Sequence, residues 1–354
     1  HVYMIETFKI EENSHRVSPQ IDKRFNILCS EERPAGYCHD SEIHTENKDW
    51  MKNLSDRNVR ITKLSIPGTH DTMAFYGGDA VQCQSLSLET QLNSGIRAID
   101  IRCRHISDVF AIHHGCVYQN ANFGDVLNTV ARYLDEHPKE TILMRVKEEY
   151  NEEKCDRTFE ETFFEAYWLP YEKYFWHTSD KFGKYIPTLS EAEGKIVVLQ
   201  NFTSNNSYGI MWDSDILAIQ DDYHLDTNWD LYEKWEKVKA HLTLANNSSD
   251  DKLYINFLSG SGGSFPYFVA SGQSSPGTND PRLLTGRTTP GWANSWPDFP
   301  RIGCFLGICS IAFEGTNILS AERIGKNNTF NSKVGIIMCD FPGKDLIESI
   351  ISLN

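Results

Sequence analysis

The sequence predicts an α/β fold with parallel strands, and three observations lead to this prediction. From Val59 onward, short β-rich runs alternate with helical or loop segments, which is the order expected when crossovers join parallel strands. Hydrophobic residues make up 40% of the 354 residues and charged residues 23%, so the chain can bury a large core. A chain of this length could form two domains, but α/β barrels routinely use it as one. We therefore expect one α/β domain.

The expected strands lie in the larger, C-terminal part of the chain. Residues 1–55 are polar and mixed in charge without sustained periodicity, and we interpret them as an irregular N-terminal extension to a domain over residues 56–354. The eight expected strands are Ile61–Ile66, Ile96–Ile101, Val109–His113, Ile142–Val146, Ile196–Leu199, Ile216–Gln220, Tyr254–Phe257 and Val334–Met338.

Two helices are expected between these strands. Apolar residues recur at helical spacing from Phe123 to Leu134, before the helix-breaking Pro138, and again from Trp229 to Leu242. The stretch 260–303 is rich in Gly, Ser, Pro and aromatic residues, which predicts a functional rim or flexible loops.

Charge and sequons indicate an acidic, secreted protein. The net charge is −15, from 34 Lys and Arg against 49 Asp and Glu, so no nucleic-acid partner is expected. The longest nearly apolar run, 302–313, is too short to span a bilayer, and no basic-then-apolar signal segment opens the chain. Six Asn-x-Ser/Thr sequons fit a mature glycoprotein of the secretory pathway, although Asn-rich tracts also create them by chance. They begin at Asn53, Asn201, Asn205, Asn246, Asn247 and Asn327.

The nine cysteines favour disulfide bonds over a metal site. No CxxC pair occurs, and the spacings Cys29/Cys38, Cys103/Cys116 and Cys304/Cys309 match no zinc module. The odd count leaves at least one thiol free.

Polar side chains stand at the ends of the expected strands or directly after them. In a closed parallel barrel, the catalytic groups lie at the carboxyl ends of the strands. The residues concerned are His70, Asp71, Asp100, Arg102, His113, His114, Lys147, Asp221, Tyr223 and Asp340. Each has a simpler structural explanation: Asp100 and Arg102 could form an ion pair, which we favour for Asp100, and Lys147 could belong to a solvated charge run. The joint pattern nevertheless predicts a site.

Six motifs in the right order resemble the bacterial-type phosphatidylinositol-specific phospholipases C, with their X-domain-like catalytic barrel. They are SIPGTHDT at 65–72, GIRAIDIR at 95–102, HHG at 113–115, ETILM at 140–144 up to Lys147, LYINF at 253–257 and GIIMCDF at 335–341. The resemblance covers 59–354 and implies a distorted TIM (β/α) barrel that cleaves the glycerol–phosphate bond of inositol phospholipids.

The resemblance also implies a role for each site residue. His70 is the general base and Asp340 the carboxylate that orients it, while His114 is the general acid. Arg102 and Asp71 belong to the phosphate site. Three further residues would surround the inositol ring: Lys147, Asp221 and Tyr223.

Chemistry agrees with these roles, because the inositol 2-hydroxyl is an internal nucleophile beside the phosphate. Two histidines suit the two proton transfers, and an arginine fork can neutralise the phosphoryl oxygens. We expect a monomeric, secreted enzyme without cofactor or metal that touches the membrane only peripherally and acts on phosphatidylinositol or a glycosylphosphatidylinositol anchor. The alternatives are a non-catalytic lipid- or glycan-binding barrel and a metal-dependent phosphodiesterase of another barrel family.

Several features depart from the family pattern. Cys103 and Cys116 are unexpected, and a bridge between them is plausible. Gln200-Asn201 stands where the family often has an arginine, which puts the headgroup contacts in doubt. For adsorption to lipid we expect exposed aromatic residues, with 265–268 and Phe75-Tyr76 as candidates.

Overall fold

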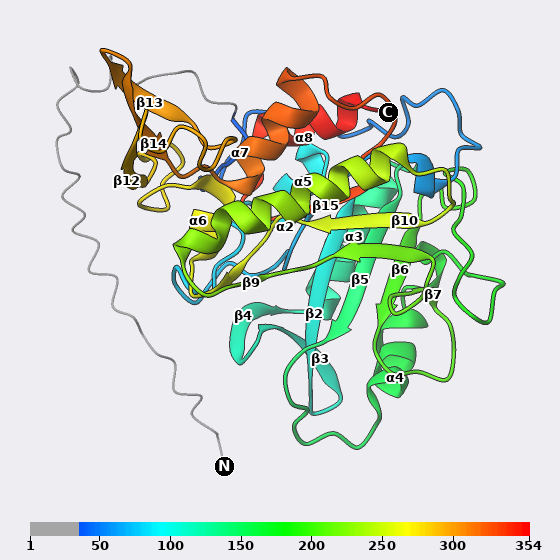
Figure 1. The fold of residues 1–354 in the computed structure, drawn as a ribbon. Coiled ribbons are helices and arrows are strands. Elements are labelled where there is room, and N and C mark those ends of the chain that lie inside the picture. Colours follow the sequence, from blue (N-terminus) through cyan, green and yellow to red (C-terminus); the bar gives the residue numbers. More distant parts are fainter. Residues whose placement is uncertain (1–34) are drawn as a thin grey trace. The chain divides into compact units, whose positions relative to one another are not determined.

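Eight parallel strands curl into an open barrel in the computed structural model, which describes residues 35–354 (Figure 1). The strands are β1 (Ile66–Thr69), β2 (Ala98–Ile106), β5 (Ile142–Glu148), β6 (Ile196–Asn201), β7 (Gly209–Met211), β8 (Leu217–Gln220), β10 (Leu253–Phe257) and β15 (Ile336–Cys339). Their order is β7-β6-β5-β2-β1-β15-β10-β8, and every neighbouring pair is parallel. Within residues 35–354, β7 and β8 do not pair, so the barrel is distorted as predicted.

Two of the expected strands differ from the prediction. The first run begins with a 3-10 turn, η1 (Ile61–Lys63), so that its strand starts only at Ile66. The run at 109 forms β3 (Val109–His114), which is antiparallel to β2 and continues into β4 (Val117–Asn122). The two-residue turn Ser107-Asp108, with φ of 48° and 59°, reverses the chain there, as a type I′ hairpin turn does.

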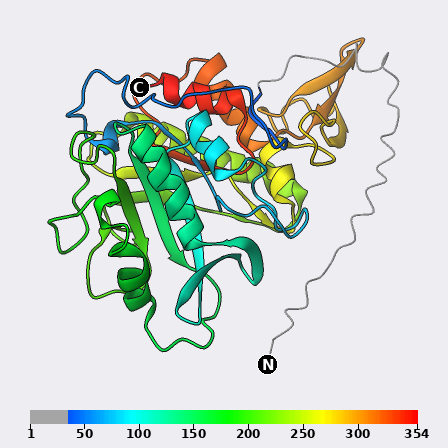
Figure 2. The same ribbon diagram turned by 180° about the vertical axis from the view of Figure 1, so that it is seen from behind.

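Helices cover the outside of the barrel, and both expected helices are present. They are α3 (Phe123–Glu136), which starts with a capping box between Asn122 and Asp125, and α5 (Leu231–Asn247). The other helices are α2 (Leu88–Ser94), α4 (Phe159–Thr162), α6 (Pro266–Ser271), α7 (Thr316–Ala321) and α8 (Lys344–Ser352). Short 3-10 or π turns are η2 (Phe163–Trp168), η3 (Glu172–Tyr174), η4 (Asn228–Asp230) and η5 (Glu322–Lys326). The reverse view shows α3 lying along the strands (Figure 2).

Alternate residues of each strand belong to two different cores. Ile66, Ala98 and Met338 lie in a cluster inside the barrel, whereas Ile99 and Ile337 pack outward against helices. Gly68 lies between Ala98 and Met338, where a Cβ would come within 2.9 Å of both side chains. The interior is therefore a packed core up to the ends of the strands.

Residues 35–55 lack regular helices or strands but pack into the same compact unit as the barrel. Trp50 is buried and donates to the carbonyl of Gly95 at 2.8 Å. Glu140, fully buried in an ion pair with Arg97, accepts the backbone N–H of Met51 at 3.1 Å. The remaining part of the predicted extension lies outside the described residues.

The stretch 260–303 is more ordered than expected, because it enters a small antiparallel sheet. This sheet has the order β12-β14-β13, with β12 (Leu284–Thr288), β13 (Arg301–Phe305) and β14 (Ile308–Ala312). A shorter pair joins β11 (Ser261–Gly262) to β9 (His224–Leu225). Figure 1 shows the three-stranded sheet projecting from the body of the protein.

One disulfide bond, Cys304–Cys309, ties β13 to β14, as the preference for disulfides predicted. The suggested Cys103–Cys116 bridge is wrong: both thiols are free, because Cys103 pairs with Ile112 in the hairpin and Cys116 lies beyond its end. Cys29 lies outside the described residues. Among residues 35–354, no helix is long and apolar enough to cross a membrane.

Candidate active site

The carboxyl ends of the strands carry polar side chains on the face that is apolar deeper in the barrel. The alternation that places Ile66 and Met338 inside the barrel continues along both strands. It therefore also places His70, four residues after Ile66, and Asp340, two residues after Met338, on the inner face. The same parity brings Asp100, Arg102 and Arg145 to this face. The predicted site residues from β1, β2 and β15 are thus gathered at one end of the barrel.

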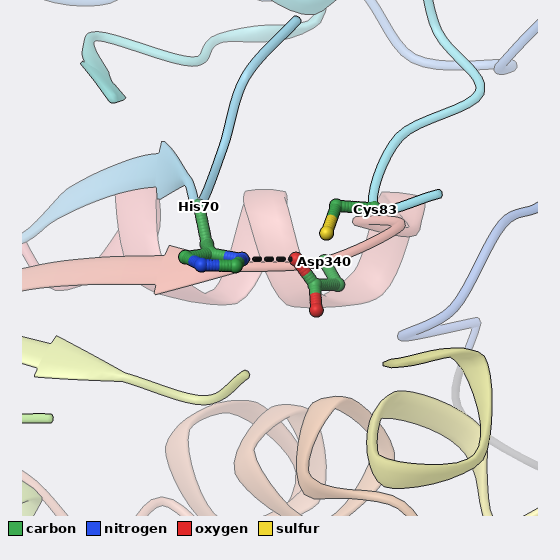
Figure 3. Close-up of side chains that lie close together, drawn as sticks. All are labelled: His70, Cys83 and Asp340. Carbon is green, nitrogen blue, oxygen red and sulfur yellow. Dashed lines mark hydrogen bonds and ion pairs between the residues drawn. The ribbon is translucent and has the colours of Figure 1, made fainter. Parts of the chain in front are cut away.

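His70 and Asp340 form the first pair, with 2.8 Å between Nδ1 and Oδ1 (Figure 3). Gln84 holds their strands together by donating to the carbonyls of His70 and Cys339 at 2.7 and 2.9 Å. Asn317 donates to the carbonyl of Asp340 at 2.7 Å. These hydrogen bonds hold the backbone at His70 and Asp340, and the contact of Nδ1 with Asp340 leaves the other ring nitrogen, Nε2, away from the carboxylate.

The charge of Asp340 determines the protonation of His70. Burial disfavours the imidazolium, but the neighbouring carboxylate outweighs burial and raises the pKa of His70 above its ordinary value. This arrangement suits a base that must hold a proton once it has accepted one.

Asp71 and His114 form the second pair, with 3.3 Å between Oδ2 and Nδ1. Nδ1 of His114 also lies 2.8 Å from the carbonyl of Val81, which can only accept, so this nitrogen carries hydrogen and leaves Nε2 for chemistry. Asp71 has a left-handed backbone, with φ of 43°, and its N–H donates to Asp100 at 2.9 Å. Burial raises the pKa of Asp71, whose carboxylate oxygens accept no hydrogen bond. His113 points the other way, is buried and packs near Tyr118, so the choice between the two histidines falls on His114.

Asp100 anchors two arginines, which confirms its expected ion pair. Arg102 donates to Oδ2 of Asp100 from Nη2 at 3.0 Å and from Nε at 3.3 Å, and Arg145 approaches Oδ1 at 3.4 Å. Burial alone would raise the pKa of Asp100, but the two guanidinium groups outweigh it and hold that pKa well below its usual range. Asp100 therefore stays ionised and fixes Arg102, whose Nη1 also lies 3.5 Å from Glu149.

Arg145 is a site residue that the sequence did not single out. It lies opposite Asp100 in the β2–β5 register, and its guanidinium sits 4.0 Å from the ring centroid of Trp212. Asn201 accepts from its Nη2 at 2.9 Å, so Asn201 faces the barrel interior while Gln200 binds the outer loop at Tyr208. The spacing of the two residues could have revealed Arg145, because it lies two residues before Lys147 and therefore on the same face of β5.

The three residues expected around the inositol ring lie at the rim. Lys147 is the last residue but one of β5 and forms a 3.6 Å ion pair with Glu149. Asp221 and Tyr223 follow β8 and are exposed. The charge of Asp221 acts on Arg145, although no hydrogen bond or ion pair joins Lys147, Asp221 and Tyr223 to one another in the described chain.

Cys83 is a second unforeseen member of the site. It lies close to His70 and Asp340 (Figure 3) and also to the second pair, Asp71 and His114. Its Sγ lies 4.0 Å from Nδ1 of His114. The same sulfur lies within 4.8 Å of a ring nitrogen of His70 and of a carboxylate oxygen of Asp340. Burial, followed by the charges of Asp340 and Asp71, raises the pKa of the thiol, which stays protonated. These nitrogen, sulfur and oxygen atoms could surround a cation, but the positive charge of Arg102 opposes one.

The arrangement offers two imidazoles, each beside a carboxylate, and a guanidinium held between acidic groups. One imidazole can accept a proton while the other donates one, and the guanidinium can stabilise an anion. Together these three elements can carry out acid–base catalysis on a phosphate diester.

Comparisons with known proteins agree with this geometry. The family model of phosphatidylinositol-specific phospholipase C, X domain, matches residues 61–202. The 1-phosphatidylinositol phosphodiesterase of Listeria monocytogenes is 35% identical over 233 residues, covering 60% of this chain and 68% of the relative. That of Staphylococcus aureus strain Newman is 34% identical over 249 residues, covering 61% and 77%.

The fold agrees as well. The structure of the phosphatidylinositol-specific phospholipase C from Listeria monocytogenes matches with a TM-score of 0.63 and 27% identity, covering 88% of this chain and 99% of that one. The resemblance read from the six sequence motifs is thereby confirmed, and so is the distorted barrel. This chain belongs to the family of bacterial-type phosphatidylinositol-specific phospholipases C.

Proposed function

We propose that this chain is a phosphatidylinositol diacylglycerol-lyase that releases diacylglycerol and inositol 1,2-cyclic phosphate. The observation that carries the proposal is the pair of histidine–carboxylate contacts beside Arg102, at 2.8 Å for His70–Asp340 and 3.3 Å for His114–Asp71. A binding barrel without catalysis would need neither pair.

His70 takes the proton of the inositol 2-hydroxyl, which then attacks the neighbouring phosphorus. Asp340 holds the ring and supports the imidazolium that forms. Because the nucleophile belongs to the substrate, binding it in the reactive conformer supplies much of the rate enhancement.

Arg102 neutralises the charge that grows on the nonbridging phosphoryl oxygens. Its position, fixed by Asp100, supports a mechanism that needs no divalent cation for this task. We assign Asp71, expected with Arg102 at the phosphate, to His114 instead, because Asp71 contacts that ring.

His114 gives its proton to the diacylglycerol alkoxide. Its side chain is 26% exposed, so it can reach a substrate at the mouth of the barrel while Asp71 behind it is buried. His70 and His114 then exchange roles if water opens the cyclic product.

Lys147, Asp221 and Tyr223 bind the inositol hydroxyls, and Arg145 joins them. Arg145 donates to Asn201 at 2.9 Å, so it supplies a guanidinium beside the position where the resemblance led us to look for an arginine. Both free phosphatidylinositol and a glycosylphosphatidylinositol anchor carry the headgroup that these residues would recognise.

We further propose a secreted, monomeric enzyme that contacts the membrane peripherally. Several sequon asparagines, including Asn53, Asn205 and Asn327, are exposed, and a disulfide bond is present, as in many secreted proteins. Of the aromatic residues expected at the lipid interface, Phe265 and Tyr76 are exposed, whereas Tyr267 and Phe268 are buried and were wrongly included.

Phosphorus NMR of an early time course on phosphatidylinositol vesicles tests the reaction. We expect inositol cyclic phosphate to appear before any acyclic phosphate, and His70→Ala to abolish both. His177→Ala, an exposed histidine outside the site, is the matched control and should be fully active. Acyclic phosphate without a cyclic precursor would mean that water attacks directly and would overturn the proposal.

A further inference from the structure

The hairpin between β13 and β14 ends in three apolar side chains that nothing in the described chain covers. Phe305 is 75% exposed, Leu306 86% and Ile308 53%. We call these three residues the apolar tip. Single exposed apolar residues are common, but three in one turn mark an interaction site.

The backbone of the turn makes the choice of Leu306 unusual. Leu306 and Gly307 have φ of 48° and 80°, while Phe305 and Ile308 pair directly, so the hairpin closes with a two-residue turn of type I′. This turn favours Asn or Asp followed by Gly, and a bulky residue with positive φ is an outlier. Leu306 is thus unfavourable for the turn and contributes no burial, which indicates a function outside the fold.

The tip is held rigidly on its base. The Cys304–Cys309 disulfide bond closes the hairpin directly behind the three side chains. Further down, Ile311 and Phe313 are buried in the core that also contains Phe268. A preformed tip loses little conformational freedom when it binds, so its apolar surface contributes more fully to affinity.

The base of the hairpin packs against the segment that follows β8, the strand whose end carries Asp221 and Tyr223. Trp229 packs against Trp296 and Phe313, with ring centroids 5.5 and 5.2 Å apart. Trp229 belongs to η4, which follows the exposed residues Asp221 and Tyr223 at the end of β8. The tip therefore projects from the part of the protein that borders the opening of the barrel.

Charge favours a lipid surface at this position. Residues 284–312 contain two arginines and one aspartate, a net charge of 2 − 1 = +1, in a chain whose net charge is −15. The aspartate, Asp298, is paired with Lys239 at 2.5 Å. Arg287 lies 4.5 Å from the ring centroid of Trp292, which is 41% exposed, and such a pair suits the headgroup layer. The rest of the acidic chain gains no attraction to anionic lipid.

We propose that the apolar tip inserts into the lipid bilayer and anchors the enzyme next to its substrate. The inference rests on the proposed function, since only an enzyme acting on a bilayer lipid benefits from such an anchor. A second copy of the chain is a poorer occupant, because three side chains cover far less than the roughly 800 Å² per partner that stable interfaces bury.

The test compares Leu306→Asn with Leu244→Asn in the full chain. Leu306→Asn fits the type I′ turn better than leucine, so its folding should be undisturbed while the tip loses its most exposed apolar side chain. Leu244 is 55% exposed on α5 and provides the matched change outside the tip.

Binding is measured by sedimentation with phosphatidylcholine vesicles, with and without phosphatidylinositol. We expect Leu306→Asn to weaken vesicle binding about tenfold or more, from the typical transfer free energy of a buried leucine. Leu244→Asn should bind like the wild type. Equal binding by all three proteins would overturn the inference, and so would a wild-type dimer that Leu306→Asn converts to monomer.

Turnover separates this inference from the proposed function. Leu306→Asn should turn over phosphatidylinositol in vesicles more slowly than the wild type but a monomeric short-chain phosphatidylinositol equally fast. Equal slowing on both substrates would refute the anchor. A wild-type protein inactive on both would refute the proposed function, while the binding to phosphatidylcholine vesicles would still test the tip.

Discussion

Replacing Arg102 by lysine tests whether a guanidinium does the work of a metal ion. Lysine keeps the positive charge but loses the planar fork that Asp100 holds through Nε and Nη2 at 3.3 and 3.0 Å. Each charge-assisted hydrogen bond contributes about 1.5–3 kcal/mol. If the fork makes two such bonds to the phosphoryl oxygens in the transition state, its loss corresponds to roughly a 10²- to 10⁴-fold lower kcat.

The assay uses monomeric short-chain phosphatidylinositol, so that membrane binding does not enter the rate. Arg104→Lys is the matched control: Arg104 lies two residues further along β2 and forms a 3.3 Å ion pair with Glu153 at the surface, so its variant should be nearly as active as the wild type. Thermal unfolding should show both variants folded, because Asp100 keeps Arg145 as a partner.

We expect the wild type to remain active in excess chelator and added calcium not to rescue Arg102→Lys. Activity that disappears with chelator and returns with calcium would refute the reasoning and favour a metal-dependent phosphodiesterase. A near-normal rate for Arg102→Lys would show that the fork does not contact the phosphate.

Three further predictions concern the proton transfers. His114→Ala should slow cleavage of the natural lipid by about 10²- to 10⁴-fold. Cleavage of a substrate with a phenolate leaving group should slow much less, because that group needs little protonation. His113→Ala is the control, and equal defects of His114→Ala on both substrates would remove His114 from the acid role. In the pH profile of kcat/KM, the acid limb should follow the raised pKa of His70. Asp340→Asn should lower that pKa, move the limb to lower pH and reduce the rate. An unmoved limb would show that another group titrates. Cys83→Ala should retain activity within about tenfold, since the protonated thiol takes no part in either transfer, and complete inactivity of a folded Cys83→Ala would contradict this.

The sequence by itself determined the fold class and most of the site. The apolar runs of the parallel strands are buried on both faces, so they stand out as continuous segments. Polar residues placed at the ends of these runs, such as His70, Arg102 and Asp340, can only lie at the edge of the barrel. Local pattern therefore located them without any knowledge of long-range contacts.

The tertiary structure alone decided which of these residues touch each other. The period of two gives a side chain's face but not its partner, so the contact between Asp71 and His114 was not foreseen. The antiparallel direction of β3 follows from the turn at Ser107 and Asp108, whose positive φ angles close a hairpin. Apolar periodicity does not reveal such a turn.

Arg145 and Cys83 escaped prediction for related reasons. Arg145 sits inside an apolar strand, where its charge is tolerated because Asp100 lies opposite it and Asn201 accepts its hydrogen bond. Cys83 lies in a loop without periodicity and reaches the site only when the chain returns to the end of β15. Both positions follow from contacts between residues far apart in sequence, and pairing across such separations is fixed by the packing of the whole barrel rather than by any local pattern.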